Sequence, residues 1–401
     1  MSGRVRALVP VRPPRPEDFT SPLRSPAVAA RVGTWLGVAF AVCFVTGLIS
    51  HWARTPDPWL AFPTRPAWGY RVTQGLHVVS GTAAVPLLLV KLWSVYHHLF
   101  APPPSLRDPR RVLVTIAERG SIALLVASSI FQLVIGLQNS AQWYPWGFDF
   151  RSVHYAVSWV LIGALVIHLG VKWPLITAAW RHDVDDRRLD QHGEAPTDDD
   201  VPAPAGVLER RGLLRLTGVA AASAVVLTAG GTVPALRPFS LFAARSGDGP
   251  GGIPINTTAR AARVVGNATA ASWALTVRTS AGERAFSLAE LRSLPQRTRT
   301  LPIACVEGWS ASGEWRGVGL RELLDGLEVP RGREVRFRSL QLSGRGVTVL
   351  PADFVDDDAT LLALDLDGEP LALDHGFPCR LIAPNRPGVY QTKWLSSLEV
   401  L

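Results

Sequence analysis

The sequence predicts a multi-domain protein in which an all-α transmembrane bundle of four helices, followed by a fifth anchoring helix, precedes an α+β domain with a mixed sheet. Hydrophobic residues make up 47% of the 401 residues, a share between that of soluble proteins and that of polytopic membrane proteins. Long apolar segments occupy the first part of the chain, up to residue 233. Residues 250–401 instead alternate short strand-like and helix-like segments, which indicates a soluble domain.

Four apolar segments are each near or above the roughly 17 to 25 residues that cross a bilayer as a helix. These segments are residues 32–50, 72–96, 122–138 and 153–171. Basic residues are frequent in the N-terminal tail, between the second and third segments, and after the fourth, whereas the other loops offer Arg54, Arg65 and little before Arg151. By the positive-inside rule, both ends of the bundle lie in the cytoplasm. This topology also accounts for the net charge of +8, so we expect no nucleic-acid binding.

Histidines within these segments are candidate haem ligands, because an ionisable residue inside a membrane is costly and is by default a functional candidate. His77 and His154 lie near the outer ends of the second and fourth segments, which run in the same direction. Both imidazoles are expected at similar depth and could bind one haem b axially, with Gly75 and Gly81 allowing close approach of the macrocycle. His51 is an alternative ligand. Histidines hydrogen-bonded to lipid headgroups or to neighbouring helices would give the same pattern.

A second haem would use His168, which follows His154 by about 21 Å along a helix axis and on nearly the same face. Its partner on the second segment is less clear. The position fourteen residues after His77 is Lys91, and His98 lies on a nearby face but deeper. The sequence therefore predicts one haem b and leaves a second one open.

Paired arginines, Arg210 and Arg211, precede the fifth apolar segment at residues 216–233. Such a pair, followed by an apolar segment rich in Ala and Gly, is typical of a twin-arginine export signal, here placed inside the chain. Positive-inside anchoring of an ordinary fifth helix would use two arginines equally well. Both interpretations place the C-terminal domain outside the cytoplasm of a bacterial cell, on a multi-pass membrane protein.

The expected domain division follows from these segments. It comprises a basic cytoplasmic tail (1–31), a cytochrome b-like membrane domain (32–173), a cytoplasmic linker (174–211), the fifth helix (212–234) and the extracytoplasmic domain (250–401).

The C-terminal domain has the pattern of an α+β fold with a mixed sheet. Strands are expected at residues 273–279, 299–304, 334–339, 347–350 and 361–366, and helices at 288–293 and 320–327. The sequence contains no βαβ repeat, glycine-rich dinucleotide loop, P-loop, HExxH motif or zinc spacing, which argues against those cofactors. The three cysteines, Cys43, Cys305 and Cys379, form no disulfide framework, although the last two could pair outside the cytosol.

Several short segments occur in a characteristic order along this domain. They are Ile255-Asn256-Thr257-Thr258-Ala259, Cys305-Val306-Glu307-Gly308-Trp309-Ser310, Leu366-Asp367-Gly368-Glu369-Pro370-Leu371, His375-Gly376-Phe377-Pro378-Cys379-Arg380-Leu381 and Gly388-Val389-Tyr390-Gln391-Thr392-Lys393-Trp394. The set resembles the molybdopterin domain of the sulfite oxidase superfamily. The cysteine segment is most similar to the bacterial protein-methionine-sulfoxide reductase branch, whose members work with a membrane haem subunit; here the two parts look fused.

The resemblance implies a molybdenum-molybdopterin cofactor and a set of residues that hold it. Cys305 would be the single protein thiolate on molybdenum, beside the two sulfurs of one pterin dithiolene, and soft sulfur ligands suit this metal. His375, Arg380 and Lys393 match positions near the pterin and its phosphate, where cationic donors are needed. Asn256 matches a loop that closes over the pterin. Each of these polar residues could also be structural.

Arg316 and Arg345 are candidate cations on the substrate side. The chain departs from true sulfite oxidases in lacking an arginine-rich stretch just after the cysteine. Set against that resemblance, the departure favours reduction of a neutral S-oxide or N-oxide over oxidation of sulfite. The expected enzyme takes electrons from quinol or a cytoplasmic donor, passes them outward through haem b, and reduces a small-molecule or protein sulfoxide. Two alternatives remain: a sulfite-type dehydrogenase that feeds electrons to quinone, and a non-catalytic membrane cytochrome with an accessory binding domain.

Overall fold

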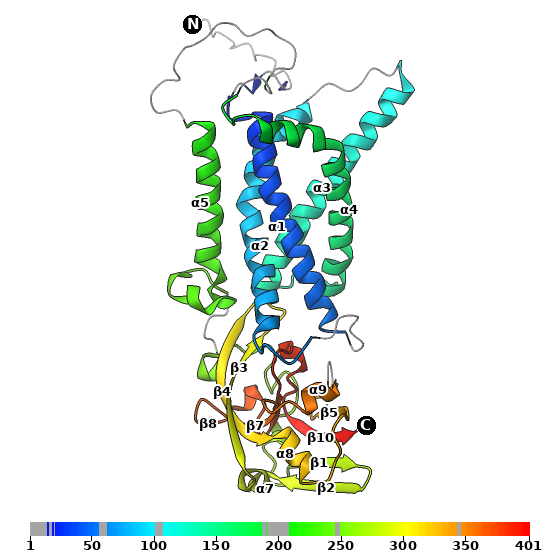
Figure 1. The fold of residues 1–401 in the computed structure, drawn as a ribbon, viewed down its shortest axis with the longest axis vertical. Coiled ribbons are helices and arrows are strands. Elements are labelled where there is room, and N and C mark those ends of the chain that lie inside the picture. Colours follow the sequence, from blue (N-terminus) through cyan, green and yellow to red (C-terminus); the bar gives the residue numbers. More distant parts are fainter. Residues whose placement is uncertain are drawn as a thin grey trace, which may run out of the picture. The chain divides into compact units, whose positions relative to one another are not determined.

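The computed structural model describes residues 14–15, 18–19, 21–55, 62–100, 107–186, 190, 208–244, 249–342 and 346–401 (Figure 1). Predictions for Arg345, for most of the N-terminal tail and for most of the linker fall outside these residues. The chain forms two compact units. One unit comprises Met1–Phe40, Ala83–Leu133 and Ser152–Ala222, and the other comprises Ala41–Thr82, Val134–Arg151 and Ser223–Leu401.

Five long helices confirm the helical N-terminal region. They are α1 (Pro26–Trp52), α2 (Gly69–Val95, continued by the 3₁₀ helix η2, Tyr96–Phe100), α3 (Pro109–Ser140), α4 (Phe150–Arg181) and α5 (Arg210–Thr228). Each is long and apolar enough to cross a membrane, judged by length and composition. The first four helices, with α2 continued by η2, extend beyond the apolar segments of the sequence, whereas α5 begins earlier than its segment and ends at Thr228. The clearest case is α3, which begins with Pro109 at a position where proline is well tolerated.

The first unit has an apolar interior between α1, α2 and α4. Leu36 and Phe40 of α1 and Leu88 of α2 pack with Leu161 and Leu165 of α4. The outward side of α4 leaves large apolar side chains exposed, as a helix in contact with lipid would.

Two five-stranded sheets form the C-terminal part of the second unit. The first has the order β2-β1-β10-β5-β6, made of β1 (Ala274–Thr279), β2 (Gly282–Ser287), β5 (Val335–Ser339), β6 (Val347–Leu350) and β10 (Leu395–Val400). In this sheet β1 and β10 are parallel, and the other neighbours are antiparallel. The second is antiparallel and contains β3 (Gln296–Ala304), β4 (Ser310–Gly319), β7 (Leu361–Leu366), β8 (Glu369–Pro370) and β9 (Arg380–Ile382). The predicted α+β mixed-sheet class is confirmed.

Several predicted elements have the observed bounds. The helix α7 (Leu288–Ser293) starts at a capping box, in which the Glu290 backbone N–H donates to Ser287 Oγ and the Ser287 backbone N–H donates to the Glu290 carboxylate. The strands β6 and β7 also match, whereas α8 (Leu320–Asp325) is two residues shorter than predicted. The small helices η4 (Ala229–Gly231), η5 (Pro234–Phe239), η6 (Pro250–Gly252), α6 (Val265–Ala268), α9 (Ala352–Val355), η7 (Leu373–His375) and η8 (Gly388–Tyr390) complete the fold.

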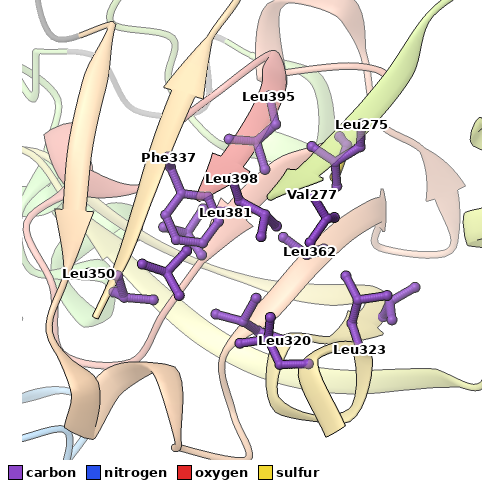
Figure 2. Close-up of a cluster of buried hydrophobic side chains, with 14 of the residues drawn as sticks. Leu275, Val277, Leu320, Leu323, Phe337, Leu350, Leu362, Leu381, Leu395 and Leu398 are labelled. Atoms are coloured by element: carbon purple, nitrogen blue, oxygen red, sulfur yellow. The ribbon is translucent and has the colours of Figure 1, made fainter. Parts of the chain in front are cut away.

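The main core lies between the first sheet, α8 and the inner side of the second sheet, as Figure 2 shows. Its labelled members are Leu275, Val277, Leu320, Leu323, Phe337, Leu350, Leu362, Leu381, Leu395 and Leu398. Cys379 belongs to this core, whereas Cys305 belongs to a second cluster with Trp309 and Trp315. Both thiols are free, so the alternative in which they form a disulfide is wrong for this structure.

Candidate functional site

Cys305 follows the last residue of β3, at the start of a tight turn into β4. Its backbone N–H donates to Trp309 O at 2.9 Å, and the Gly308 N–H donates to Cys305 O at 3.1 Å. Gly308 has φ +84°, and a Cβ at this position would lie 3.0 Å from Ser140 Oγ. The turn therefore favours glycine for its backbone conformation, and a larger residue would also make a tight contact with Ser140. Two paired strands and this turn fix the direction of the Cys305 side chain.

The thiol lies in the wall of a cavity of about 390 Å³. All five residues that the resemblance assigns to the cofactor line this cavity: Asn256, Cys305, His375, Arg380 and Lys393. The fold thus brings together residues that are up to 137 positions apart in the sequence. Among the described residues that line the cavity there is no aspartate or glutamate, so its fixed charge is positive.

Lys393 holds the segment that contains Asn256. Its ammonium Nζ donates to Asn256 Oδ1 at 3.2 Å, to Thr257 O at 2.6 Å and to Asp374 O at 3.0 Å. Burial, and next the nearby Arg380 guanidinium, lower the pKa of Lys393 to about 7. A bound anion would favour the charged form of Lys393, because its attraction to the ammonium would offset the solvation that the side chain loses by burial.

Arg380 in β9 is buried and carries a charge in the cavity wall. Its Nη1 donates to His375 O at 2.8 Å and its Nη2 to Gln391 O at 3.2 Å, while the guanidinium lies 5.0 Å from the centre of the Trp315 ring. Burial lowers the pKa of Arg380 to about 9. Its buried Nε has no hydrogen-bond partner within the described part of the chain. A buried donor of this kind is costly unless a ligand accepts from it.

His375 lies at the end of η7, and its Nε2 is 2.8 Å from Pro250 O, a distance that assigns the proton to Nε2. Burial, and next the Arg380 guanidinium, lower the pKa of His375 to about 4. The imidazole is therefore neutral near neutral pH, and the cationic character of this part of the wall comes from Arg380 and Lys393.

These residues fit an anionic molybdenum-pterin group. Burial, and next the Glu307 carboxylate, raise the pKa of the Cys305 thiol to about 12, so the metal-free thiol is protonated. Binding of a metal would displace that proton, as it does for thiolate ligands in general. The partnerless Arg380 Nε is a suitable donor to a phosphate, and the Lys393 ammonium, whose three donors are engaged by Asn256, Thr257 and Asp374, adds positive charge beside it.

Arg316 does not reach the cavity. On β4 it follows Trp315, and neighbouring strand residues point to opposite faces, so burial of Trp315 leaves Arg316 on the outer face. Its side chain is 54% exposed and lies 3.6 Å from the Asp365 carboxylate. The prediction that Arg316 is a cation on the substrate side is not supported by this position. The equivalent prediction for Arg345 lies outside the described residues.

Other cavity residues were missed by sequence reasoning. Arg151 in the first turn of α4 lines the cavity, as do Ile253, Gln341, Gln391 and Thr392. Gln391 fixes the adjoining backbone, because its Oε1 accepts from Ala383 N at 2.8 Å and its Nε2 donates to Ala383 O at 3.1 Å. The one sequence feature that could have drawn attention to Arg151 is its position in a loop that otherwise has few cations.

The predicted haem ligand His77 is hydrogen-bonded to α1. Its Nδ1 lies 2.8 Å from the backbone carbonyl oxygen of Cys43, which assigns the proton to Nδ1 and makes Nε2 the basic nitrogen. The ring packs on α1 at Gly47, where a Cβ would lie 2.8 Å from His77 Cε1. Gly81 also faces α1, because a Cβ built at this position would lie 3.5 Å from Cys43 Sγ. A Cβ at Gly75 would instead face Thr232. The two flanking glycines thus face protein atoms in this structure.

The alternative ligand His51 lies in the same unit as His77, whereas the candidates on α4 lie in the other unit. His154 and His168 are both in α4, and Gln132 Nε2 of α3 donates to His154 O at 2.8 Å. Lys91 Nζ donates to Ala29 O at 2.8 Å. Because His77 belongs to the second unit and His154 to the first, a haem shared by the two stays a prediction.

The paired arginines before α5 both have partners. Arg210 is buried and donates to Pro22 O at 2.9 Å, to Val184 O at 3.2 Å and to the Asp190 carboxylate. Arg211 forms ion pairs with Asp183 at 2.6 Å and Asp185 at 2.7 Å. These contacts suit the anchoring interpretation, and they do not test recognition of the pair during export.

Residues 262–401 match the family described as Oxidoreductase molybdopterin binding domain. The chain is 31% identical over 118 residues to the "Putative protein-methionine-sulfoxide reductase subunit YedZ1" of Azospira oryzae, a match that covers 29% of this chain and 44% of that protein. It is 27% identical over 152 residues to the mitochondrial sulfite oxidase of Drosophila melanogaster, covering 31% of this chain and 26% of the relative.

Among solved structures, the chain is similar to the sulfane dehydrogenase SoxCD from Paracoccus pantotrophus, at 25% identity, over 32% of this chain and 38% of that chain. The TM-score of 0.30 is too low to carry an argument. The chain spans less than half the length of each of these three proteins. The family match and the two curated relatives lead to one conclusion: residues 262–401 belong to the oxidoreductase molybdopterin-binding domains of the sulfite oxidase superfamily.

Proposed function

We propose that this chain is a membrane-bound molybdenum oxidoreductase that removes oxygen atoms from S-oxides or N-oxides, with electrons that arrive through haem b. The observation that carries the proposal is the cavity at Cys305. It combines one thiol with a buried cation, Arg380, a half-buried cation, Lys393, and no carboxylate among its described lining residues. This set supports binding of a soft metal together with an anionic organic group.

Each residue of the cavity has a proposed task. The Cys305 thiolate would hold molybdenum, while Arg380 and Lys393 would bind the pterin phosphate, and Asn256 would keep Lys393 in place through its 3.2 Å hydrogen bond. Ile253, Ile303 and Trp309 line the cavity beside Cys305 and would exclude water from the reacting atoms. The bound cofactor would supply the two-electron chemistry of oxygen-atom transfer. For an S-oxide the balance is one S–O bond broken, with two electrons and two protons consumed and water released.

The electrons for this reaction would come from quinol or from a cytoplasmic donor, through haem b bound by His77 and His154. The hydrogen bond from His77 Nδ1 to the Cys43 carbonyl supports this role, since metal-binding histidines usually donate their second nitrogen in this way. His168 is the proposed ligand of a second haem. We further propose that the five helices cross a bacterial membrane with the C-terminal domain outside the cytoplasm, exported through Arg210 and Arg211 if the twin-arginine interpretation holds.

The test is turnover by the purified full-length protein in detergent. Reduction of sulfoxides and N-oxides would be assayed with a reduced viologen as the electron donor. Oxidation of sulfite would be assayed with ferricyanide as the electron acceptor. We expect sulfoxide or N-oxide reduction to be fastest. Sulfite oxidation alone would replace the proposal with a dehydrogenase that feeds quinone, and absence of any turnover in a molybdenum-loaded sample would contradict the proposed activity.

A further inference from the structure

The segment formed by residues 139–151, which joins α3 to α4, is fastened at its first end to the turn that carries Cys305. Asn139 is buried, and its Nδ2 donates to Val306 O at 2.9 Å. Beside it, Ser140 Oγ lies 3.0 Å from the position of a Gly308 Cβ. Close contact of this kind between two segments so distant in sequence indicates that the turn and the end of α3 pack as one piece.

The loop in the middle of segment 139–151 folds back on the same anchor. Tyr144 OH donates to Asn139 Oδ1 at 3.0 Å, so both polar atoms of the Asn139 side chain are engaged. Trp146 Nε1 donates to Gln138 Oε1 at 2.9 Å, one residue before the segment. These bonds restrict the loop, and with it the start of α4.

The last residue of the segment, Arg151, lines the same cavity as Cys305. Its side chain is 52% exposed, and its ion pair is with Asp149 at 3.4 Å, an exposed contact of the weak kind. Arg380 and Lys393, the other cations of the wall, are instead held by several oxygens each. Arg151 is therefore the lining cation that can most easily exchange its partner for a ligand oxygen.

We propose that segment 139–151 completes the Cys305 cavity and that Arg151 is a specificity-determining residue, which favours substrates with a carboxylate or other anionic group close to the reducible oxygen. The choice of an S-oxide as substrate rests on the proposed function; the anion preference rests on the cavity. A guanidinium binds a carboxylate with two parallel hydrogen bonds. The described lining residues include no acid, and the carboxylate that a ligand would have to replace is the exposed Asp149. The sequence motifs of the C-terminal domain could not show this, because the residue comes from the helical region.

A matched pair of substrates tests the preference. N-acetylmethionine sulfoxide and its methyl ester contain the same S–O bond and differ by one negative charge. For Arg151→Gln, we expect KM to rise about tenfold more for the acid than for the ester, as loss of a hydrogen bond to a charged group predicts. Arg151→Lys should recover part of this difference, and Arg316→Gln, which alters an arginine outside the cavity, should leave both values within twofold. Equal effects of Arg151→Gln on the two substrates would overturn the proposal.

A binding measurement separates this inference from the proposed function. Sulfate would be titrated into the full-length protein and into Arg151→Gln by calorimetry, with no turnover required. We expect the dissociation constant for sulfate to rise about tenfold in the variant. If the variant and the native protein bind sulfate equally, or if neither binds it, Arg151 is not an anion site. If sulfate binding responds but neither sulfoxide is reduced, the cavity inference stands and the proposed reaction fails.

Discussion

Two regions of this molecule contain the residues predicted to bind cofactors, and the structure treats them differently. In the C-terminal part, five residues between Asn256 and Lys393 converge on one cavity. In the helices, His77 and His154 fall in separate units, and each is placed by its own helix contacts. Strand register and short turns determine which side chains meet, whereas helical periodicity determines a residue's face and depth but not its partner.

The largest expected effect tests the cavity. Cys305→Ala removes the proposed metal ligand, so molybdenum content and turnover should fall by more than the roughly 10- to 100-fold that loss of an outer partner of a metal ligand causes. The measurement is metal analysis together with the reductase assay. Cys379→Ala is the matched control, since Cys379 is also buried but belongs to the main core and is not among the cavity's lining residues. Retention of molybdenum by Cys305→Ala would remove this residue from the metal site.

The second test concerns the helices. His77→Ala and His154→Ala should each abolish the b-type bands of the reduced-minus-oxidised optical spectrum of the purified protein, because each removes an axial ligand. His182→Ala is the control, as His182 pairs with Asp186 at the end of α4. Bands of full intensity in both variants would show that these histidines are packing residues. The predicted cofactor ligands would then be limited to the C-terminal region.

The third test concerns the turn at Cys305. Gly308→Ala places a side chain at φ +84° and against Ser140, so we expect the free energy of unfolding to fall by about 1–3 kcal/mol. Thermal denaturation would measure it. Gly266→Ala is the control, because a Cβ there meets nothing within 4 Å. Equal stability of the two variants would mean that the turn can relax and does not fix Cys305.

The smallest effect is a pH dependence. Burial raises the pKa of Asp357, but the Ala359 N–H, the Thr64 hydroxyl and the Arg65 guanidinium outweigh it and lower the pKa. A lowered folded-state pKa gives stability that is present above the unfolded value of about 3.9 and is lost as the pH falls through the folded value. The effect should stay below about 1 kcal/mol, because Arg65 is 60% exposed.

Asp357→Asn should therefore flatten the dependence of Tm on pH below about pH 4, whereas Asp358→Asn, at a more exposed carboxylate, should change it less. The Arg65–Asp357 ion pair joins the two regions compared above, because Arg65 precedes α2 and Asp357 belongs to the C-terminal part of the same unit. An unchanged pH profile would show that this contact adds nothing to stability.

Much of the fold could be predicted from local signals. Apolar length identified the five helices, and the local residue pattern predicted α7, whose capping box of Ser287 and Glu290 is seen in the structure. The strand β4 was missed because Gly313 and Gly317 weaken its local signal. Its position depends on pairing with β3 and β7, and Gly317 is needed because a Cβ would lie 2.1 Å from Leu362 O. This requirement comes from a contact between strands that are distant in the sequence, so it cannot be predicted from the residues around Gly317 alone.

The candidate site shows the same division. The ordered segments of the C-terminal domain led to five residues of the cavity wall through their resemblance to the sulfite oxidase superfamily. Arg151 was missed because it lies more than 150 positions before Cys305 and has no motif around it. Arg316 was predicted to be a cation on the substrate side, but the alternation along β4 turns its side chain outward. The domain boundaries and the two-haem arrangement stay predictions.

The most direct test of the central claim is X-ray absorption at the molybdenum edge of the purified full-length protein. If Cys305 holds the metal in the cavity lined by Arg380 and Lys393, the spectrum should show one sulfur neighbour beyond the dithiolene pair. A molybdenum-loaded protein with dithiolene sulfurs alone, or a protein that binds no molybdenum, would contradict the account.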